Sequence, residues 1–366
     1  MSSRVLISGG GTGGHVFPAI AIANALKEID SSIDIKFVGA KGKLEMKKVP
    51  EAGYDIEGLW ISGFNRQQLL KNSLLPFKIF FSLLKAYGII KSFKPNVVVG
   101  VGGYASGSTM WVANKKGIPV VVQEQNSFAG VTNKLMADKA KRFCVAYDNM
   151  GRFFPKERVI KTGNPVRSNI ANMVVNRQVA LETYGLSSDK KTILVIGGSL
   201  GARTINRSLQ KDFAQITEAG YQLIWQTGQI YIDQILKEIH PTDSSKIMAF
   251  IKEMDKAYAA ADIIISRAGA LSIAELACVG KPVILVPSPN VAEDHQTKNA
   301  LALVENDAAI MINDRDAEAD LVPAALNLIE DENRCAELAK NIKQMAIPDA
   351  ARRIANEIIA IAKNEL

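Results

Sequence analysis

The chain has 366 residues, of which 48% are hydrophobic, 22% charged and 7% aromatic, a composition that is typical of globular proteins and excludes a disordered chain or a collagen-like repeat. At ~100–200 residues per domain, this length predicts two domains. The net charge of +7 is divided into +12 in residues 1–165 and −5 in residues 166–366, which predicts that one half meets an anionic partner, either nucleic acid or a phospholipid surface.

The cysteines and histidines are too few and too scattered for a disulfide framework or a structural zinc site. There are three of each and no C-x-x-C pair: Cys144, Cys278, Cys335, His15, His240 and His295. We therefore expect no metal site, and a reducing cytoplasm as the compartment. We also expect neither a signal peptide in MSSRVLISGG nor a membrane-spanning helix, because no run of ~20 apolar residues reads as one helix.

Apolar, β-branched runs alternate with segments of helical periodicity along the whole chain, a pattern that predicts βα units and parallel sheets. In the first half we predict strands near Arg4–Ser8, Asp34–Val38, Asn96–Val99, Pro119–Gln123 and Arg142–Val145. After Gly163-Asn164-Pro165 the pattern begins again, with strands near Thr192–Ile196, Gln222–Gln226, Asp262–Ser266, Pro282–Val286 and Ala308–Met311.

This pattern predicts an α/β fold of two doubly wound domains, residues 1–163 and 164–347, with the ligand in the cleft where the strand ends of both domains converge. A closing helix is predicted over residues 348–366. In two-lobed folds such a helix can cross back to the first domain.

Three glycine clusters each lie between a predicted strand and a predicted helix: Gly9–Gly14, Gly100–Gly107 and Gly197–Ala202. Glycines let the backbone approach a ligand, and the helix that follows offers free N–H groups and its positive dipole end to an anion. Three such loops predict two phosphate-bearing substrates in one cleft.

The first cluster also satisfies the G-x-G-x-x-G spacing of dinucleotide-binding domains, at Gly9, Gly11 and Gly14. A nicotinamide dinucleotide would need an acidic residue at the end of the second strand, where this chain has only glycine, alanine and lysine. A tight turn without a ligand is less consistent still, because five glycines in six positions exceed what a turn needs.

Glu275 lies one turn inside another predicted helix, in SRAGALSIAEL (residues 266–276). A carboxylate at this place either compensates the helix dipole or binds the two hydroxyls of a ribose.

Seven motifs follow one another in a specific order: GGTGGHVFPA, GGYASG, QEQNSFAG, TGNPVR, GGSLGA, SRAGALSIAEL and EDHQTKNA. In this combination the chain resembles, over essentially its whole length, the MurG family of bacterial undecaprenyl-diphospho-muramoylpentapeptide N-acetylglucosaminyltransferases. The resemblance implies a GT-B fold of two Rossmann-like domains, with the nucleotide sugar held mainly by the second. It also implies inverting transfer of N-acetylglucosamine from UDP-N-acetylglucosamine to the muramoyl C4 hydroxyl of lipid I, which gives lipid II for peptidoglycan synthesis.

The resemblance implies that residues of these motifs bind the donor: Thr12, Gly13, Gly14, Asn126, Arg167, Ser199, Ile251, Ala270, Leu271, Ser272, Glu275 and Gln296. Arg167 and Ser199 match positions that contact the diphosphate, and Ile251 matches one that contacts uracil through its backbone. Asn126 and Gln296 would lie near the sugar, and Glu275 would bind the ribose. His295 stands where another glutamine occurs in some members.

Structural interpretations stay open for three of these residues. Asn126 is also a turn former, Ile251 is also a core residue, and Arg167 follows a valine and a proline in a linker where it could be solvated.

Inversion needs a general base for the attacking hydroxyl and positive groups for the departing diphosphate. His15, with a reference pKa near ~6.5, and Glu124 are equal candidates for the base. Arg167, Ser199 and helix ends would meet the charge of the leaving group, so the chemistry needs no metal and no cofactor. The single D-x-D, Asp314-Arg315-Asp316, precedes a predicted helix and is expected to cap it.

The segment LLKNSLLPFKIFFSLLKAYGIIKSFK (residues 69–94) is apolar almost all round, with Lys71, Lys78 and Lys85 at every seventh position. A buried helix would bury these lysines at high cost unless they reached water. We therefore expect a monotopic patch on the anionic inner-membrane surface, and a peripheral protein at the cytoplasmic face of the cell membrane.

Two other functions remain as alternatives. A UDP-N-acetylglucosamine epimerase of the same architecture would act without a lipid acceptor, and the patch argues against it. A basic nucleic-acid-binding protein would use the +12 half, but the basic residues are not interleaved with aromatic residues, so we expect no nucleic acid partner.

Overall fold

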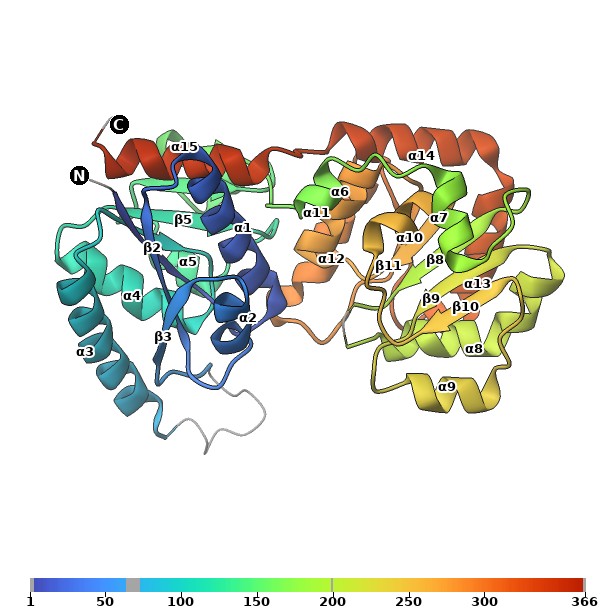
Figure 1. Cartoon of the computed structure of the whole chain (residues 1–366), viewed down its shortest axis with the longest axis horizontal. Coiled ribbons are helices and arrows are strands. Elements are labelled where there is room, and N and C mark those ends of the chain that lie inside the picture. Colours follow the sequence, from blue (N-terminus) through green and yellow to red (C-terminus); the bar gives the residue numbers. More distant parts are fainter. Residues whose placement is uncertain (1–2, 64–72, 199, 365–366) are drawn as a thin grey trace. The chain divides into compact units, whose positions relative to one another are not determined.

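The structure of the protein is a computed structural model that describes residues 3–63, 73–198 and 200–364 (Figure 1). It divides into two compact units. The first unit comprises Met1–Val166 and Asp349–Leu366, and the second comprises Arg167–Pro348. Each unit contains a parallel sheet with helices on both faces, so the predicted α/β fold of two doubly wound domains is confirmed.

In the described residues of the first unit the sheet has seven strands, in the order β3-β2-β1-β4-β5-β6-β7, and every neighbouring pair is parallel. The strands are β1 (Arg4–Ser8), β2 (Asp34–Ala40), β3 (Asp55–Leu59), β4 (Val97–Gly100), β5 (Val120–Glu124), β6 (Arg142–Val145) and β7 (Val159–Lys161). The direction of winding reverses between β1 and β4, and ligands of such sheets bind at the carboxyl ends of the strands beside this reversal.

Helices cover both faces of this sheet because its central strands are apolar on both sides. Val5 and Ile7 of β1 face one core and Leu6 faces the other, as the alternation of a strand requires. The first core is covered by α1 (Gly13–Ile29), α2 (Glu45–Glu51) and α15 (Ala350–Ala362); the second is covered by α3 (Leu75–Phe93), α4 (Tyr104–Lys115) and α5 (Val131–Lys134). Two short 3₁₀ turns, η2 (Met150–Arg152) and η3 (Lys156–Arg158), precede β7.

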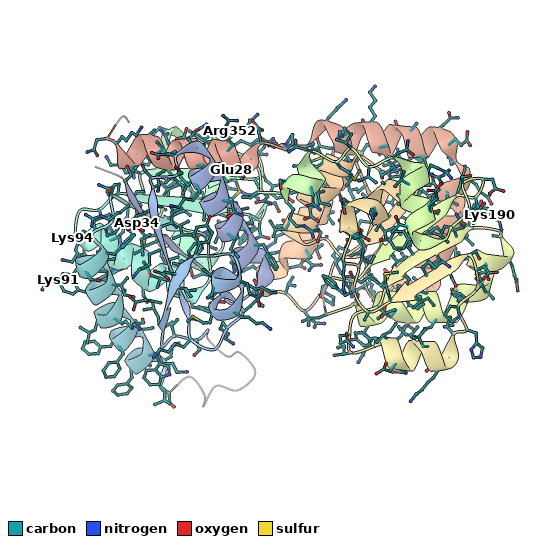
Figure 2. The ribbon with its side chains drawn as sticks, viewed as in Figure 1. Glu28, Asp34, Lys91, Lys94, Lys190 and Arg352 are labelled. Atoms are coloured by element: carbon teal, nitrogen blue, oxygen red, sulfur yellow. The ribbon has the colours of Figure 1, made fainter. Side chains whose placement is uncertain are left out.

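The last helix, α15, belongs to the first unit and packs against α1 (Figure 1). Ile354, Ile358 and Ile361 recur at helical spacing and enter the same core as the first strand. Arg142 of β6 and Glu357 form a half-buried ion pair of 3.0 Å on the same side. The opposite side of the helix is charged, and Arg352 projects outward (Figure 2).

In the described residues of the second unit the sheet has six parallel strands, in the order β10-β9-β8-β11-β12-β13. They are β8 (Thr192–Ile196), β9 (Gln222–Gln226), β10 (Ser245–Met248), β11 (Ile263–Ser266), β12 (Val283–Leu285) and β13 (Ile310–Met311). The helices are α6 (Ser168–Ala171), α7 (Arg177–Tyr184), α8 (Arg203–Glu218), α9 (Ile232–Glu238), α10 (Met254–Ala260), α11 (Ala270–Val279), α12 (His295–Val304), α13 (Ala317–Glu330) and α14 (Glu332–Gln344), with the 3₁₀ turn η4 (Ala292–Asp294) before α12. Here the winding reverses between β8 and β11.

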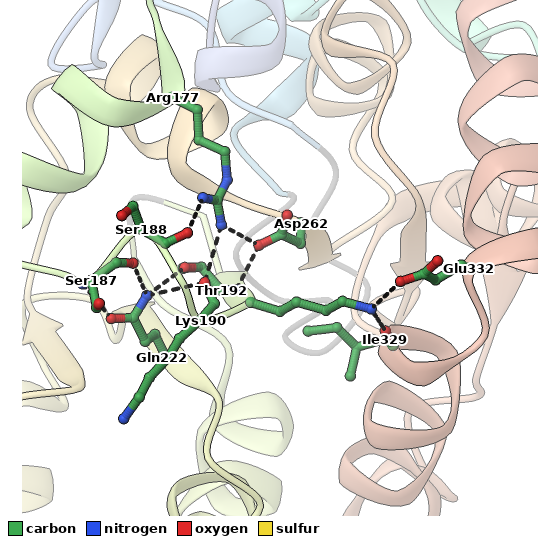
Figure 3. A network of polar contacts seen from close by, with 10 residues as sticks. Arg177, Ser187, Ser188, Lys190, Thr192, Gln222, Asp262, Ile329 and Glu332 are labelled. Carbon is green, nitrogen blue, oxygen red and sulfur yellow. Dashed lines mark hydrogen bonds and ion pairs between the residues drawn. The ribbon is translucent and has the colours of Figure 1, made fainter.

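A polar network fixes the amino-terminal end of this second sheet (Figure 3). Asp262, just before β11, accepts hydrogen bonds from the Arg177 guanidinium at 2.8 Å and from the Thr192 N–H at 2.7 Å. Gln222, the first residue of β9, bonds the Thr192 hydroxyl and the main chain of Ser187. This network lies at the strand starts, so it stabilises the sheet at the end away from the glycine loop that follows β8.

All ten strands that the sequence pattern predicts with bounds are present, with ends displaced by two residues at most. The strands for which it gives no bounds are β3, β7 and β10. All three lie at sheet edges. Edge strands need not be apolar on both sides. The sequences of β3 (DIEGL), β7 (VIK) and β10 (SKIM) contain charged residues, which disfavour pairing with another chain but also weaken the alternating pattern that predicts a strand.

Candidate functional site

Two glycine loops interlock at the carboxyl ends of β1 and β4, where the winding of the first sheet reverses. The Gly10 N–H donates to the Gly102 carbonyl at 3.3 Å. Gly103, at a φ of +86°, leaves no room for a side chain, because a Cβ there would overlap the Gly10 carbonyl. The two loops therefore form one rigid surface at the position where α/β sheets bind ligands.

The predicted donor residues of the first loop form the start of α1. Thr12 is the residue that precedes the helix, and Gly13 and Gly14 are its first two residues. The Thr12 side chain makes no capping bond to the helix, and Thr12 and Gly14 are exposed. No side chain therefore caps this helix start in the described residues, and a helix start of this kind suits an anion.

His15 lies half-buried on the same turn, with its ring packed over Gly102. Its Nδ1 atom lies 3.2 Å from the Gly10 carbonyl oxygen and 3.4 Å from the Thr12 hydroxyl. A carbonyl oxygen only accepts hydrogen bonds, so these partners assign the ring proton of the neutral imidazole to Nδ1. The unprotonated nitrogen is then Nε2, the atom that a general base uses.

Glu124, the other candidate base, ends β5 and is fully buried. Its Oε1 accepts from the N–H of Asn126 at 3.0 Å and from the Asn126 side-chain amide at 3.3 Å. Its Oε2 accepts from the Gly130 N–H at 2.9 Å and the Asn133 amide at 2.8 Å. These four bonds fill the ~4 lone-pair sites of a carboxylate. Glu124 therefore organises residues 124–130, including Asn126.

Burial raises the pKa of the Glu124 carboxyl, while the bonds from Gly130, Asn126 and Asn133 oppose that shift. A raised pKa suits a base, but a base must also reach its proton. The burial and the four donors favour His15 over Glu124 for that reason.

Gln125 and Asn164 connect this loop with two other motifs. The Gln125 side chain donates to the Val101 carbonyl at 2.8 Å, and the Asn164 amide donates to the Gln125 carbonyl at 2.9 Å. GGYASG, QEQNSFAG and TGNPVR thus meet at one edge of the first sheet.

In the second unit the structure brings together two predicted site residues, Arg167 and Glu275. The guanidinium of Arg167, which precedes α6, donates to both carboxylate oxygens of Glu275 in α11, at 2.7 and 2.8 Å. The Tyr258 hydroxyl donates to Glu275 Oε2 at 3.3 Å. The hydrogen bond to Glu275 raises the pKa of Arg167, and burial together with the Glu275 charge raises the pKa of Tyr258.

Ala270, Leu271 and Ser272 form the first turn of α11, directly after the loop that follows β11. Glu275 lies on the next turn of this helix, as the sequence predicts. The first-turn N–H groups of α11 lie at the carboxyl end of β11, beside the reversal of the second sheet.

Ser199 lies outside the described residues, but the loop around it is held by Gln226 at the end of β9. The Gln226 amide donates to the Gly198 carbonyl at 2.9 Å, and its oxygen accepts from the Ile251 N–H at 2.9 Å. The Ile251 side chain is buried. Ile251 is thus a core residue whose backbone is also fixed beside the glycine loop.

Gln296, the second residue of α12, accepts from the Ser288 N–H at 2.9 Å through its side-chain oxygen. This bond orients the Gln296 amide and fixes the segment after β12. His295 is the first residue of the same helix.

The expectation that the D-x-D motif caps a helix is only partly met. Asp316 precedes α13 but its side chain makes no capping bond. Asp314 instead binds the Arg267 guanidinium at 2.5 Å and the Thr204 hydroxyl at 2.9 Å, so it joins the loop after β11 to the start of α8. In the part of the chain that the structure describes, no group of three or more His, Cys, Asp or Glu residues could hold a metal ion.

Sequence reasoning missed the role of the buried or partly buried polar residues that hold these loops: Glu45, Gln125, Asn133, Asn164, Gln226, Arg267 and Asp314. For Gln226 one signal was present, since a glutamine ends the apolar strand QLIWQ at the edge where ligands bind. The other partners are distant in sequence and no local pattern reveals them.

A family model described as the glycosyltransferase family 28 N-terminal domain matches residues 5–145, and one described as the family 28 C-terminal domain matches residues 192–354. The chain belongs to glycosyltransferase family 28. Its relatives include the UDP-N-acetylglucosamine--N-acetylmuramyl-(pentapeptide) pyrophosphoryl-undecaprenol N-acetylglucosamine transferases of Parabacteroides distasonis and Bacteroides thetaiotaomicron. Each is 54% identical, and the alignments cover 98% and 99% of this chain and 98% of either relative.

Among solved structures, the crystal structure of MurG from Acinetobacter baumannii matches with a TM-score of 0.80 and 29% identity, over 98% of this chain and 99% of that one. The resemblance to the MurG family is thereby confirmed. A UDP-N-acetylglucosamine 2-epimerase structure also matches, with a TM-score of 0.68 but only 15% identity over 100% of this chain and 98% of that one, which shows a shared fold alone.

The Gln226 bridge gives a testable prediction about this family 28 chain. Gln226→Leu should lower the free energy of unfolding of the second unit by about 2–6 kcal/mol, because a carbonyl and a buried N–H each lose a partner at about 1–3 kcal/mol. Denaturant unfolding followed by Trp225 fluorescence, in a background with Trp60 and Trp111 replaced by Phe, measures the change. Gln234→Leu on the exposed side of α9 is the control, and an equal effect of the two changes would contradict the bridge.

Proposed function

We propose that this chain transfers N-acetylglucosamine from UDP-N-acetylglucosamine to the C4 hydroxyl of the muramoyl sugar of lipid I, with inversion at the anomeric carbon, to form lipid II for peptidoglycan synthesis. The observation that carries this proposal is the 54% identity, over nearly the full length of both chains, to transferases named for this donor and this lipid-linked acceptor. The epimerase alternative is not favoured, because its support is a shared fold at 15% identity.

The second unit provides the donor site in this proposal. The start of α11 offers the N–H and hydroxyl groups of Ala270, Leu271 and Ser272. The Ile251 carbonyl can accept from uracil, and the bond from the Ile251 N–H to Gln226 fixes the backbone at this position. Ser199 and Arg167 would contact the diphosphate. Gln296 and Asn126 would contact the sugar, and Thr12, Gly13 and Gly14 would also bind the donor.

The Arg167–Glu275 pair must open before either member can take its proposed role. Arg167 and Tyr258 together occupy three of the ~4 lone-pair sites of the Glu275 carboxylate, which leaves too few for both hydroxyls of a ribose. Donor binding would therefore exchange this pair for two new contacts, the guanidinium to the diphosphate and the carboxylate to the ribose diol.

His15 is the proposed general base. Its Nε2 would take the proton of the C4 hydroxyl as that oxygen attacks the anomeric carbon. The bond from the anomeric carbon to the diphosphate oxygen breaks, and UDP leaves with the electron pair. Arg167, Ser199 and the first turn of α11 would stabilise the charge that develops on UDP.

We also propose that the protein binds the anionic inner-membrane surface from the cytoplasmic face through α3. Phe77, Phe80 and Phe81 expose half or more of their surface, and Trp60 lies against Phe81 with ring centroids 6.2 Å apart. The other side of the helix is buried through Ser82, Ala86, Ile89 and Ile90. An apolar face of this size on a surface helix is typical of an interfacial contact.

Lysines surround this apolar face, as binding to anionic headgroups requires. Lys78 lies over the Trp60 ring at 5.8 Å and Lys116 over the Tyr87 ring at 4.2 Å. Lys91 and Lys94 project from the end of α3 (Figure 2). Lys71 of the predicted stripe lies outside the described residues. Within the described part of the chain no helix is both long and apolar enough to span a bilayer.

A transfer assay tests the proposed reaction. With labelled UDP-N-acetylglucosamine and a shortened lipid I analogue, we expect labelled disaccharide-lipid in equal yield with and without EDTA. Conversion of the UDP-sugar in the absence of acceptor, without transfer, would favour the epimerase. Loss of transfer in EDTA would contradict metal independence.

The donor site is tested by Glu275→Ala. We expect UDP affinity measured by calorimetry to fall at least about tenfold, because a hydrogen bond to a charged group contributes about 1.5–3 kcal/mol. The circular dichroism spectrum should not change. Glu305→Ala, an exposed residue of the same unit, is the matched control, and equal UDP affinities for both variants would remove Glu275 from the site.

The membrane surface is tested by replacing Phe77, Phe80 and Phe81 with Ser. Association with anionic vesicles should fall at least about tenfold, because a phenylalanine gains ~1.5–3 kcal/mol when fully buried. Turnover of a short soluble acceptor should be retained. Val174→Ser with Val179→Ser, two exposed positions of the second unit, is the control. Equal loss of vesicle binding and turnover would indicate misfolding and contradict a membrane role.

A further inference from the structure

Glu45 is a buried carboxylate beside the first glycine loop. It is the first residue of α2, and only 1% of its surface is exposed. A buried carboxylate is costly unless its oxygens are paired or hydrogen-bonded. Among the described residues, no lysine or arginine forms an ion pair with Glu45, and its partners are backbone N–H groups.

Those two N–H groups come from different segments. Glu45 Oε1 accepts from the Ala40 N–H at the end of β2, at 2.8 Å, and Oε2 accepts from the Gly11 N–H in the glycine loop, at 2.9 Å. The Glu45 side chain fits against Gly10 and Gly39 so closely that a Cβ on either glycine would overlap it. Glu45 therefore holds the loop against the second strand.

The Gly11 N–H belongs to the same peptide group as the Gly10 carbonyl. That carbonyl oxygen lies 3.2 Å from His15 Nδ1, which donates to it. One planar peptide group thus joins the Glu45 carboxylate on one side to the His15 imidazole on the other. The order of contacts is carboxylate, N–H, C=O, and then the ring N–H.

We propose that Glu45 is a positioning residue for His15, and that it acts through the Gly10–Gly11 peptide group. This inference rests on the proposed function of His15 as the base. The carboxylate polarises the peptide group, and hydrogen bonds in such a chain strengthen one another. The Gly10 carbonyl then keeps the ring proton on Nδ1, holds the ring in one orientation and stabilises the imidazolium that forms when Nε2 takes the acceptor proton.

In serine proteases and related enzymes a carboxylate orients the catalytic histidine by a direct hydrogen bond. Here a peptide group lies between the carboxylate and the histidine. The insertion keeps the negative charge of Glu45 buried. A glycine loop whose N–H groups face an anion can in this way also support a base.

Imidazole nitrogen NMR tests the wild-type protein first. The chain has three histidines, so His15→Gln assigns the His15 ring signals. We expect the neutral ring of His15 to carry its proton on Nδ1. A ring protonated on Nε2 would overturn the proposal without any variant of Glu45.

Glu45→Gln tests the carboxylate itself. The glutamine NH₂ opposes one of the two N–H groups and the negative charge is lost, so the His15 ring should titrate at lower pH and populate the other tautomer. In the transfer assay kcat should fall about 10- to 100-fold, as for other residues that orient a functional side chain, with little change in the KM for the UDP-sugar. The acidic limb of the pH profile should move to lower pH.

Glu51→Gln on the exposed side of α2 is the matched control and should change none of these values. Unchanged His15 titration and tautomer in a folded Glu45→Gln protein would overturn the proposal, as would a raised KM with an unmoved pH profile, which indicates a purely structural role. Full transfer by His15→Gln would show that His15 is not the base. No transfer by the wild-type protein would contradict the proposed function. The NMR signals of the His15 ring distinguish both cases from a failure of the positioning role proposed for Glu45.

Discussion

In a parallel sheet the carboxyl ends of all strands lie at one edge, and this constraint decides where each unit can bind a ligand. The loops after β1, β4 and β5 come from residues far apart in sequence, yet they meet because those strands are neighbours in the sheet. The same holds for the loops after β8, β9 and β11 in the second unit. Helix starts follow β1, β4, β8 and β11, and they bring the N–H groups of their first turns to that edge.

Loops rich in glycine would be too flexible for such sites, and buried polar side chains limit that freedom. Glu45 and Glu124 accept from backbone N–H groups in the first unit, and Gln226 bridges a carbonyl and an N–H in the second. Asp314 also holds a loop in place, because it accepts from Arg267 after β11 and from Thr204 at the start of α8. The groups that would contact substrate therefore depend on a second set of residues that are buried or partly buried and hold the loops.

The sequence predicts those features that are local. Local sequence patterns predict the central strands with two apolar sides, the glycine clusters and the start of α11. These features are enough to predict the two sheets. The strands β3, β7 and β10 are not predicted because they lie at sheet edges, where only one side of a strand must be apolar. The role of Glu45 is not predicted because its partner, Gly11, lies 34 positions away in the sequence. The role of Asp314 in the D-x-D motif is not predicted because its partner, Arg267, lies 47 positions away.

The first unit is built from both ends of the chain, since α15 covers the core beside α1 only after residues 167–348 have been made. During synthesis the apolar surface formed by Val5, Ile7 and Ile22 lacks this cover until the last helix leaves the ribosome, whereas the second unit is continuous. Domains usually complete their folding in the order of synthesis. In this chain we expect the reverse order of completion, with the unit that begins first becoming resistant to proteases last.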